Sequence, residues 1–249
     1  MEKEIAWLLK EKYHGKPGAK FTRDALRVKN GEPLDYIIGF ADFLGCKIDL
    51  SKKPLIPRFE TEFWVEQVIE SMSAKKNNLV KEKIMVLDMF AGSGCIGLAV
   101  LKHIQNSVVM FADSEKNCIE QIAINGKING IDKKRYVIIK SDVFENIQGT
   151  FDYIFANPPY IPEEKKMVLQ KSVIDFEPHV ALFGDNDGLG YIRKFLALAK
   201  DFLTENGKIY MEFDTPQKPA IQKLLKKLKY RSWEFCKDQY GKTRYVVVG

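Results

Sequence analysis

Short apolar runs alternate with amphipathic segments along the chain from residue 84 onward. The runs are rich in β-branched and aromatic residues, as strands are, whereas the segments between them repeat apolar residues every three or four positions, as helices do. Because helices separate most of the runs, the pattern predicts an α/β fold with a doubly wound, mostly parallel seven-stranded sheet. The expected strands lie at 84–90, 108–113, 136–142, 151–160, 208–213, 232–238 and 243–249.

The last two strands should break the parallel pattern. Only four residues, "QYGK" at 239–242, separate them. A parallel pair needs a crossover of a dozen or more residues, whereas an antiparallel pair needs only a tight turn. We therefore expect these two strands to pair antiparallel.

The chain before residue 84 has a looser pattern. Ile5 and Leu8 lie at helical spacing and predict one short amphipathic helix, followed by a loose basic segment to about residue 30. Residues 36–50 contain two β-rich pieces around a glycine, which are typical of a hairpin, and a link with prolines leads into a helix that Thr61 could cap. We expect a short N-terminal helical segment at 1–33, a β-hairpin and linker at 34–58, and the main domain at 59–249.

Composition and charge exclude few classes of fold or partner. The chain has 249 residues, of which 45% are hydrophobic, enough for one sizeable core. The net charge of +6 is compatible with a nucleic-acid or ribosomal partner, but many basic enzymes bind neither. The lysines at 217–229 give no further support, since they alternate with a core-facing stripe formed by Ile221, Leu224, Leu225 and Leu228.

The positions of cysteine and histidine bear on metal binding and location. The four cysteines and three histidines are scattered, without a C-x-x-C pair or metal-ligand spacing, so neither a metal site nor a disulfide framework is predicted. The first residues do not resemble a signal peptide, and no apolar run approaches membrane-spanning length. We expect a cytoplasmic protein with no metal and no membrane partner.

Small and acidic residues follow the first three strands, where doubly wound sheets bind ligands. "DMFAGSG" follows the first strand, and its Gly92 and Gly94 let backbone approach a ligand at a helix N-terminus. It is not a P-loop, because no G-K-[ST] follows. It is also a poor dinucleotide fingerprint, because Phe90 occupies the place of the first glycine of G-x-G-x-x-G. Asp113 ends the second strand and suits ribose hydroxyls, and Asp142 ends the third and suits an exocyclic amine. Taken alone, each acid is more typical of a turn or cap.

The fourth strand is followed by "NPPY" at 157–160. Proline cannot donate to a sheet ladder, so the strand must stop at Asn157. A side-chain amide, a rigid backbone and an aromatic ring then stand beside the three other strand ends. Each signal is weak separately, but their convergence on one crevice predicts a binding site.

Taken together, D-x-F-A-G-S-G, Asp113 and N-P-P-Y resemble a class I S-adenosyl-L-methionine-dependent methyltransferase acting on a planar nitrogen. Four further blocks resemble the release-factor glutamine methyltransferases (the PrmC/HemK family): "GEPLDYIIGFADFLG", "LIPRFETE", "EPHVALFGDNDGLGYIRKFL" and "DQYGKTRYVVV", in this order. The resemblance runs from about residue 31 onward and implies a Rossmann-like catalytic domain with S-adenosyl-L-methionine as cofactor. It implies as substrate the glutamine of the Gly-Gly-Gln loop of a peptide chain release factor, methylated on its side-chain amide nitrogen.

The same resemblance assigns roles to individual residues. Asp113 would hold the ribose, Asp142 and Val143 would border the adenine, and Asn157 would lie within reach of the cofactor. The rest of the cofactor site would be the loop of Phe90, Ala91, Gly92, Ser93 and Gly94. The target glutamine would be held by Asn157, Pro158, Pro159 and Tyr160, of which Asn157, Pro158 and Tyr160 are the candidate catalytic residues.

The chemistry explains why such residues are needed. An amide nitrogen is a poor nucleophile, so it must be oriented toward the methyl group, and the positive charge that grows on it must be stabilised in the transition state. The side-chain oxygen of Asn157 and the carbonyl oxygen of Pro158 can accept from its two N–H groups, and Tyr160 offers a flat face to the amide. Arg58, Glu60 and Thr61 are equally interpretable as substrate contacts or as linker and cap. Glu177 is interpretable as a loop anchor or a substrate contact, and the anchor is favoured.

The chain departs from the family pattern in three places. Only 30 residues precede "GEP", where the family usually has a longer helical domain that helps to grip the release factor. Phe59 stands where the family usually has proline, and Phe90 stands where glycine is usual. The Phe90 change should alter packing beside the cofactor.

Two other functions fit parts of the pattern. An adenine-amino methyltransferase of DNA or RNA would also use N-P-P-Y, but the acid-rich segment at 163–187 disfavours duplex DNA. A non-catalytic ribosome- or RNA-binding module would not need N-P-P-Y together with Asp113. We expect a monomer that acts on a release factor and not on DNA.

Overall fold

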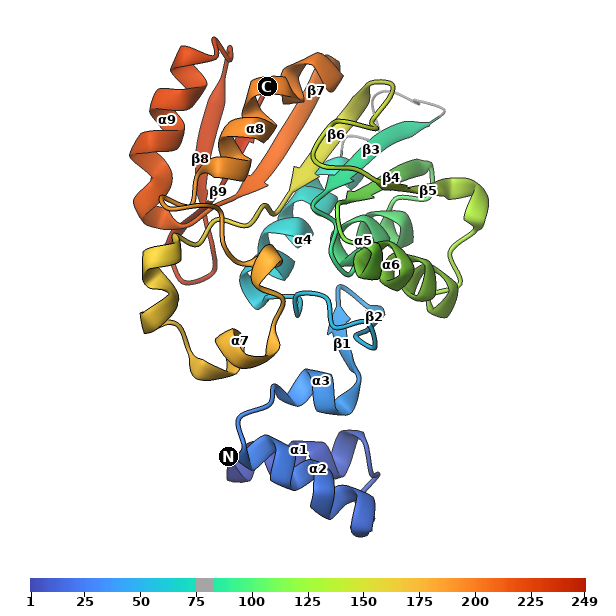
Figure 1. Ribbon diagram of the computed structural model, residues 1–249. Helices are drawn as coiled ribbons and strands as arrows, with labels where there is room; N and C mark the ends of the chain where they lie inside the picture. The colour runs from blue at the N-terminus through green and yellow to red at the C-terminus, as the bar shows by residue number, and fades with distance from the viewer. Residues whose placement is uncertain (75–82) are drawn as a thin grey trace.

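The computed structural model describes residues 1–74 and 83–249, and within them the main sheet has seven strands (Figure 1). Their order is β5-β4-β3-β6-β7-β9-β8. The first five of these pair parallel, while β9 pairs antiparallel with both β7 and β8, so both sequence predictions are confirmed. The strands are β3 (Ile84–Met89), β4 (Ser107–Asp113), β5 (Tyr136–Lys140), β6 (Phe151–Ala156), β7 (Leu203–Glu212), β8 (Trp233–Lys237) and β9 (Thr243–Val248).

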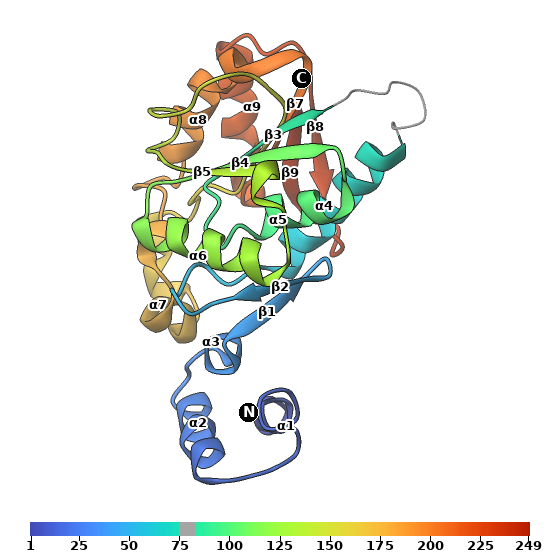
Figure 2. The same ribbon diagram turned by 90° about the vertical axis from the view of Figure 1, so that its right-hand side faces the viewer.

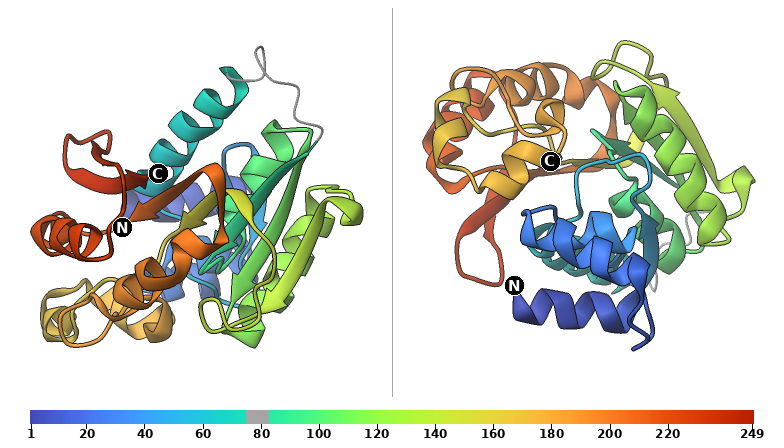
Figure 3. Two further views of the ribbon diagram at one scale, coloured as in Figure 1. Left: turned by 90° about the horizontal axis from the view of Figure 1, so that it is seen from above. Right: turned by 60° about the horizontal axis from the view of Figure 1, so that its bottom comes forward.

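Helices cover both faces of the sheet (Figures 2 and 3). One face packs against α4 (Phe59–Ala74), α5 (Cys95–His103) and α6 (Lys116–Ile128), and the other against α8 (Gly190–Leu198) and α9 (Lys218–Lys227). Trp64 of α4 is fully buried and stacks on Phe155 of β6 and Tyr245 of β9. The chain order reverses direction between β3 and β6, which is where ligands of such sheets bind.

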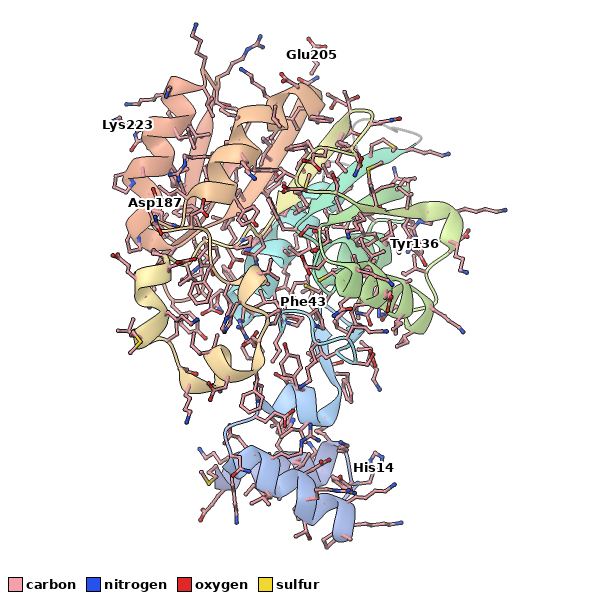
Figure 4. All side chains as sticks on the ribbon, in the orientation of Figure 1. His14, Phe43, Tyr136, Asp187, Glu205 and Lys223 are labelled. Atoms are coloured by element: carbon pink, nitrogen blue, oxygen red, sulfur yellow. The ribbon has the colours of Figure 1, made fainter. Side chains whose placement is uncertain are left out.

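The N-terminal residues contain more helix than the sequence predicted. The expected helix is α1 (Glu2–Glu11), but the segment read as loose and basic forms α2 (Ala19–Lys29), and α3 (Leu34–Ile38) precedes the hairpin. These helices share a small core of Leu8, Val28 and Ile37 below the sheet, and His14 lies between α1 and α2, far from the strands (Figure 4). Polar and apolar contacts both hold α2 in place: Asp24 accepts hydrogen bonds from Lys12, Tyr13 and Arg27, and Val28 is part of the small core.

A two-stranded hairpin joins these helices to the main domain. It consists of β1 (Phe40–Phe43) and β2 (Cys46–Asp49), paired antiparallel, so it begins four residues later than predicted. The side chain of Asn125 in α6 accepts from the backbone of Asp49 at 2.8 Å, and Phe43 and Ile48 are buried in the core shared with α4 and α5.

Several element boundaries also differ from the prediction. β7 begins at Leu203 instead of 208, because the helical residues before it, α8 and a 3-10 turn, end at Phe202. The stripe on α9 is confirmed, because Ile221 and Leu225 are buried, and Lys223 projects from the outer side (Figure 4). The remaining short elements are α7 (Lys171–Phe176) and 3-10 turns at Lys133–Arg135, Glu163–Val168, His179–Ala181, Ala199–Phe202 and Thr215–Gln217. In the described part of the chain, no helix is both long and apolar enough to cross a membrane.

Candidate active site

Two cavities adjoin at the carboxyl ends of the central strands. The first lies over the loops that follow β3, β4 and β5, and the second lies beyond the end of β6, toward α7 and Glu212. Leu55, Arg58, Asn157 and Ala181 line both cavities. Asn157 therefore stands at the junction, where a group held in one cavity meets a group held in the other.

The first cavity gathers most of the predicted cofactor residues. Its lining includes Phe90, Ala91, Gly92, Ser93, Asp113, Asp142, Val143 and Asn157. Pro159, which the resemblance assigns to the substrate, also lines this cavity and not the second. Gly94 is not part of the lining. It forms the N-cap of α5, with a φ of 78°. At Gly92, φ is 54° and an added methyl group would meet only the Phe90 carbonyl oxygen, at 4.0 Å. This open space leaves the backbone of the loop accessible to a ligand.

Asp113 connects two of these loops. One carboxylate oxygen accepts from the backbone N–H of Gly92 at 2.8 Å, and the other accepts from Glu115 at 2.9 Å. Burial raises the pKa of Asp113, although these two bonds oppose the shift. The turn-forming role that the sequence left open is thus present, and the side chain also lines the cavity.

Two residues of the lining have unusual backbone conformations. Phe90 has a φ of 60° and Val143 a φ of 49°, both in the left-handed region that favours glycine. The Phe90 ring makes edge contacts with Tyr191 and Phe195 of α8, at centroid distances of 5.9 and 6.1 Å. Phe90 therefore has a backbone conformation that glycine would adopt more easily, but its ring packs against α8.

Asp88 near the end of β3 and Asp142 after β5 have contrasting environments. Asp88 is buried beneath the loop, where one oxygen accepts from Gly97 at 2.8 Å and the other has no partner in the described residues; burial raises its pKa to about 8. Asp142 is exposed at the cavity rim and lies 3.7 Å from the ammonium of Lys194. Asp142 thus stays available to a ligand, whereas Asp88 supports the start of α5.

The second cavity contains the other residues of N-P-P-Y. Pro158 and Tyr160 line it, together with Glu212 at the end of β7. Glu212 is buried and accepts three hydrogen bonds, from Thr61 Oγ1 at 2.7 Å, Trp64 Nε1 at 2.8 Å and the Tyr160 hydroxyl at 3.1 Å. Burial raises the pKa of Glu212, and the three donors offset part of this shift. Thr61 is therefore a side-chain donor to Glu212, so its predicted role as a helix cap is wrong, since α4 begins at Phe59.

Residues of two segments, 184–188 and 215–217, contact the backbone of N-P-P-Y. Gln217 Nε2 donates to the Tyr160 carbonyl at 2.9 Å and to the Gly188 carbonyl at 3.0 Å. Gly184 and Gly188 are buried so close to the carbonyls of Pro159 and Tyr160 that an added Cβ would overlap them. These glycines allow the two backbones to touch, which fixes the direction of the segment after β6.

The sequence of the chain is similar to those of known methyltransferases. The family described as methyltransferase small domain matches residues 68–176. The release factor glutamine methyltransferase of Lactococcus lactis is 33% identical over 98% of this chain and 88% of its own length. That of Streptococcus pneumoniae is 37% identical over 87% of this chain and 75% of its own. The chain belongs to the release factor glutamine methyltransferase family.

Solved structures show the same fold for this methyltransferase. A ribosomal protein L11 methylase from Lactobacillus delbrueckii subsp. bulgaricus matches 80% of the chain and 81% of its own, with a TM-score of 0.53 and 18% identity. A methyltransferase from Pyrococcus furiosus matches 91% of the chain and 96% of its own, with a TM-score of 0.55 and 19% identity. These likenesses concern the fold and confirm the predicted class I methyltransferase architecture.

Two of the sequence blocks that carry the family resemblance of this methyltransferase, "LIPRFETE" and "EPHVALFGDNDGLGYIRKFL", have clear structural roles. Arg58 donates to Glu177 at 2.7 Å, and the backbone N–H of Ile56 lies 3.3 Å from the same carboxylate. Glu177 is buried and thus anchors the linker, as expected, while Arg58 also lines both cavities. Glu60 lines neither cavity.

Sequence reasoning missed several residues of the site. Glu212 stood in an apolar strand, and Gln217 stood at the start of a lysine-rich helix, so neither carried a motif. Gly184 and Gly188 stood in "FGDNDGLG", which was noted only as part of the family resemblance. The glycine density of that loop was the available signal, because closely spaced glycines indicate backbone that must approach other backbone.

Proposed function

We propose that this protein transfers a methyl group from S-adenosyl-L-methionine to the side-chain amide nitrogen of the glutamine in the Gly-Gly-Gln loop of a peptide chain release factor. The observation that carries the proposal is the position of Asn157, at the junction of a cavity suited to the cofactor and a cavity suited to a side chain. Membership of the family supplies the substrate class.

The groups that line the first cavity suit the cofactor. Asp113 offers carboxylate oxygens for ribose hydroxyls, and Asp142 at the rim offers an acceptor for an exocyclic amine. The loop at 90–93 brings backbone to the lining, and Gly92 leaves open space there. Val143 adds an apolar wall for a base. When bound, S-adenosyl-L-methionine supplies an electrophilic methyl group on a sulfonium, so the protein need not activate it further.

The residues after β6 are proposed to act on the glutamine. Asn157 Oδ1 and the carbonyl oxygen of Pro158 accept from the two N–H groups of the substrate amide, which orients the nitrogen and stabilises the positive charge that grows on it. Pro158 and Pro159 fix the backbone that carries these acceptors. Tyr160 borders the same cavity, and its hydroxyl is tied to Glu212. The acceptors act more strongly in the transition state than on the uncharged amide, which is the condition for catalysis.

Location, assembly and partner choice are part of the same proposal. We place the protein in the cytoplasm as a monomer, where newly made release factors are available. The segment after N-P-P-Y carries Glu163, Glu164, Asp175, Asp185 and Asp187, a charge distribution that repels the phosphates of duplex DNA. A peptide loop entering the second cavity meets no such penalty.

The proposal predicts the behaviour of Asn157→Ala. Removing one acceptor aimed at developing charge should cost on the order of 3 kcal/mol of barrier, or about 100-fold in kcat. Asn157 has one described hydrogen bond, a 3.4 Å contact to Thr61, so folding and cofactor binding should be little affected. Asn30→Ala, at an exposed position at the end of α2, is the matched control.

The test compares possible substrates side by side. The purified chain is incubated with methyl-labelled cofactor and, in parallel, with a release factor, DNA and RNA, while calorimetry measures cofactor binding. Label on the release-factor glutamine, lost in Asn157→Ala and kept in Asn30→Ala, supports the proposal. Label on nucleic acid, or full activity of Asn157→Ala on the release factor, contradicts it.

A further inference from the structure

We infer that Thr61, held in place by Glu212, sets the direction of the Asn157 side-chain amide so that its oxygen is left to accept from the substrate. Thr61 and Glu212 are then positioning residues for the reaction. The inference rests on the proposed function for the role of that oxygen, but the direction of the amide can be measured independently. It concerns three residues from α4, β7 and the segment after β6: Thr61 lines the first cavity, Glu212 the second and Asn157 both.

The direction follows from counting protons. A threonine hydroxyl has one proton to donate, and Thr61 Oγ1 lies 2.7 Å from Glu212 Oε2. The same oxygen receives the indole N–H of Trp64 at 2.8 Å, and an indole nitrogen only donates, so Glu212 Oε2 is an acceptor. The Thr61 proton is thereby committed to Glu212. Only lone pairs of Thr61 Oγ1 remain for any other neighbour.

Asn157 is that neighbour. Its Nδ2 lies 3.4 Å from Thr61 Oγ1, and a lone pair favours the NH2 end of an amide over its oxygen end. With Nδ2 turned to Thr61, Oδ1 is the end that remains unused for a substrate N–H. In the opposite orientation, two oxygens would face each other at Thr61, and the Asn157 NH2 would meet the NH2 of the substrate. The hydroxyl of Thr61 therefore excludes the unproductive orientation.

The surroundings of Glu212 make this arrangement rigid. The carboxylate is 1% exposed and its second oxygen accepts from the Tyr160 hydroxyl at 3.1 Å. One buried group thus holds a residue of each cavity, Thr61 in the first and Tyr160 in the second. A buried acceptor with three donors keeps its direction because each lost bond would leave a polar group unpaired.

The decisive variant is Thr61→Val, which keeps the shape of the side chain and removes the hydroxyl. We expect kcat on a release factor to fall by roughly 10- to 100-fold, with the KM for the release factor and the Kd for S-adenosyl-L-methionine changed by less than about threefold. Thr61→Ser, which restores the hydroxyl, should recover most of the activity. Recovery by serine separates positioning from packing, because serine packs less well than valine but donates as threonine does.

A matched control lies on the same strand as Glu212. Thr204 at the start of β7 donates to Asp152 Oδ1 at 3.0 Å, so Thr204→Val also removes a hydroxyl from a carboxylate partner. It should lower the melting temperature to a similar extent and leave kcat unchanged. If both valine variants lose activity equally, the effect of Thr61 is one of stability and the inference is overturned.

A second readout does not depend on turnover. In protein labelled with ¹⁵N-asparagine, the Asn157 side-chain NH2 signal is assigned by its absence in Asn157→Ala. We expect one of its protons to exchange with solvent at least about tenfold more slowly in the wild type and Thr61→Ser than in Thr61→Val. Equal exchange in all three would show that Thr61 does not engage the NH2 end and would overturn the inference. If no release factor is methylated while the exchange pattern holds, the proposed function fails and the amide direction stands.

Discussion

Gly184→Ala should disable the site through the backbone alone. Gly184 is buried, and its own N–H donates to the carbonyl of Ile161 at 3.0 Å. A methyl group added there would overlap the carbonyl oxygen of Pro159 and lie 2.9 Å from that of Gly188. Both obstacles are main-chain atoms, so no side-chain rotation can relieve the contact. The segment at 157–160 must move instead.

The size of the effect follows from the overlap. Ordinary contacts of a Cβ with such atoms are 3.4–4 Å, so the Pro159 carbonyl must shift by about 1 Å. A misplacement of about 1 Å in a positioning segment costs on the order of 100-fold in rate. The overpacking itself should lower the free energy of unfolding by about 1–3 kcal/mol. The rate effect should therefore exceed what partial unfolding explains.

The assay measures kcat on a release factor, cofactor affinity and denaturant unfolding in parallel. Gly18→Ala is the control, because Gly18 has an extended φ of −166° and nothing within 4 Å of an added Cβ. We expect Gly184→Ala to keep most of its cofactor affinity, lose activity and remain folded at 25 °C. A folded Gly184→Ala with the kcat of the Gly18 control would show that the N-P-P-Y segment does not depend on this contact.

Two further changes test other parts of the molecule. Burial would raise the pKa of Asp24, but its hydrogen bonds to Lys12, Tyr13 and Arg27 outweigh this effect and lower the pKa to about 2. The ionised carboxylate therefore stabilises the folded protein by up to about 2 kcal/mol above pH 4. This contribution is lost as the pH falls toward 2. Unfolding free energies of Asp24→Asn and wild type should differ at pH 7 and converge near pH 2, and a constant difference would refute this origin. Phe90→Gly should relieve the strain of a positive φ but lose ring packing on α8, for a net loss of about 1–3 kcal/mol in denaturant unfolding. An increase in stability would show that strain outweighs packing there.

The sheet and its ligand edge were predictable because their signals are local. Each strand carries its own run of apolar residues, and the ends after β3 and β6 are marked by glycines and prolines whose backbone requirements are known. Asp113 and Asn157 could be placed together from strand order alone, since the carboxyl ends of parallel strands share one edge. These parts of the site follow from the alternation of strands and helices.

The supporting residues were not predictable for the opposite reason. Thr61 and Glu212 are 151 residues apart in the chain, and Arg58 and Glu177 are 119 apart, so no window of sequence contains either pair. Thr61 had the appearance of a helix cap until the start of α4 at Phe59 was known. Likewise, Asp24 of α2 is paired with Lys12 of the segment after α1, and Val28 packs against Leu8 and Ile37, which lie outside α2. Partners distant in sequence leave no local pattern.

The position of β9 has a consequence for the order of events during synthesis. β9 lies between β7 and β8, although both are made before it. Until residues 243–248 leave the ribosome, β7 has an exposed edge and β8 has no strand to pair with. The open edge of β7 includes Ile209 and Met211. At this stage a strand of a neighbouring chain could pair with β7 in place of β9. Pairing of β9 with β7 removes this open edge and ends that stage.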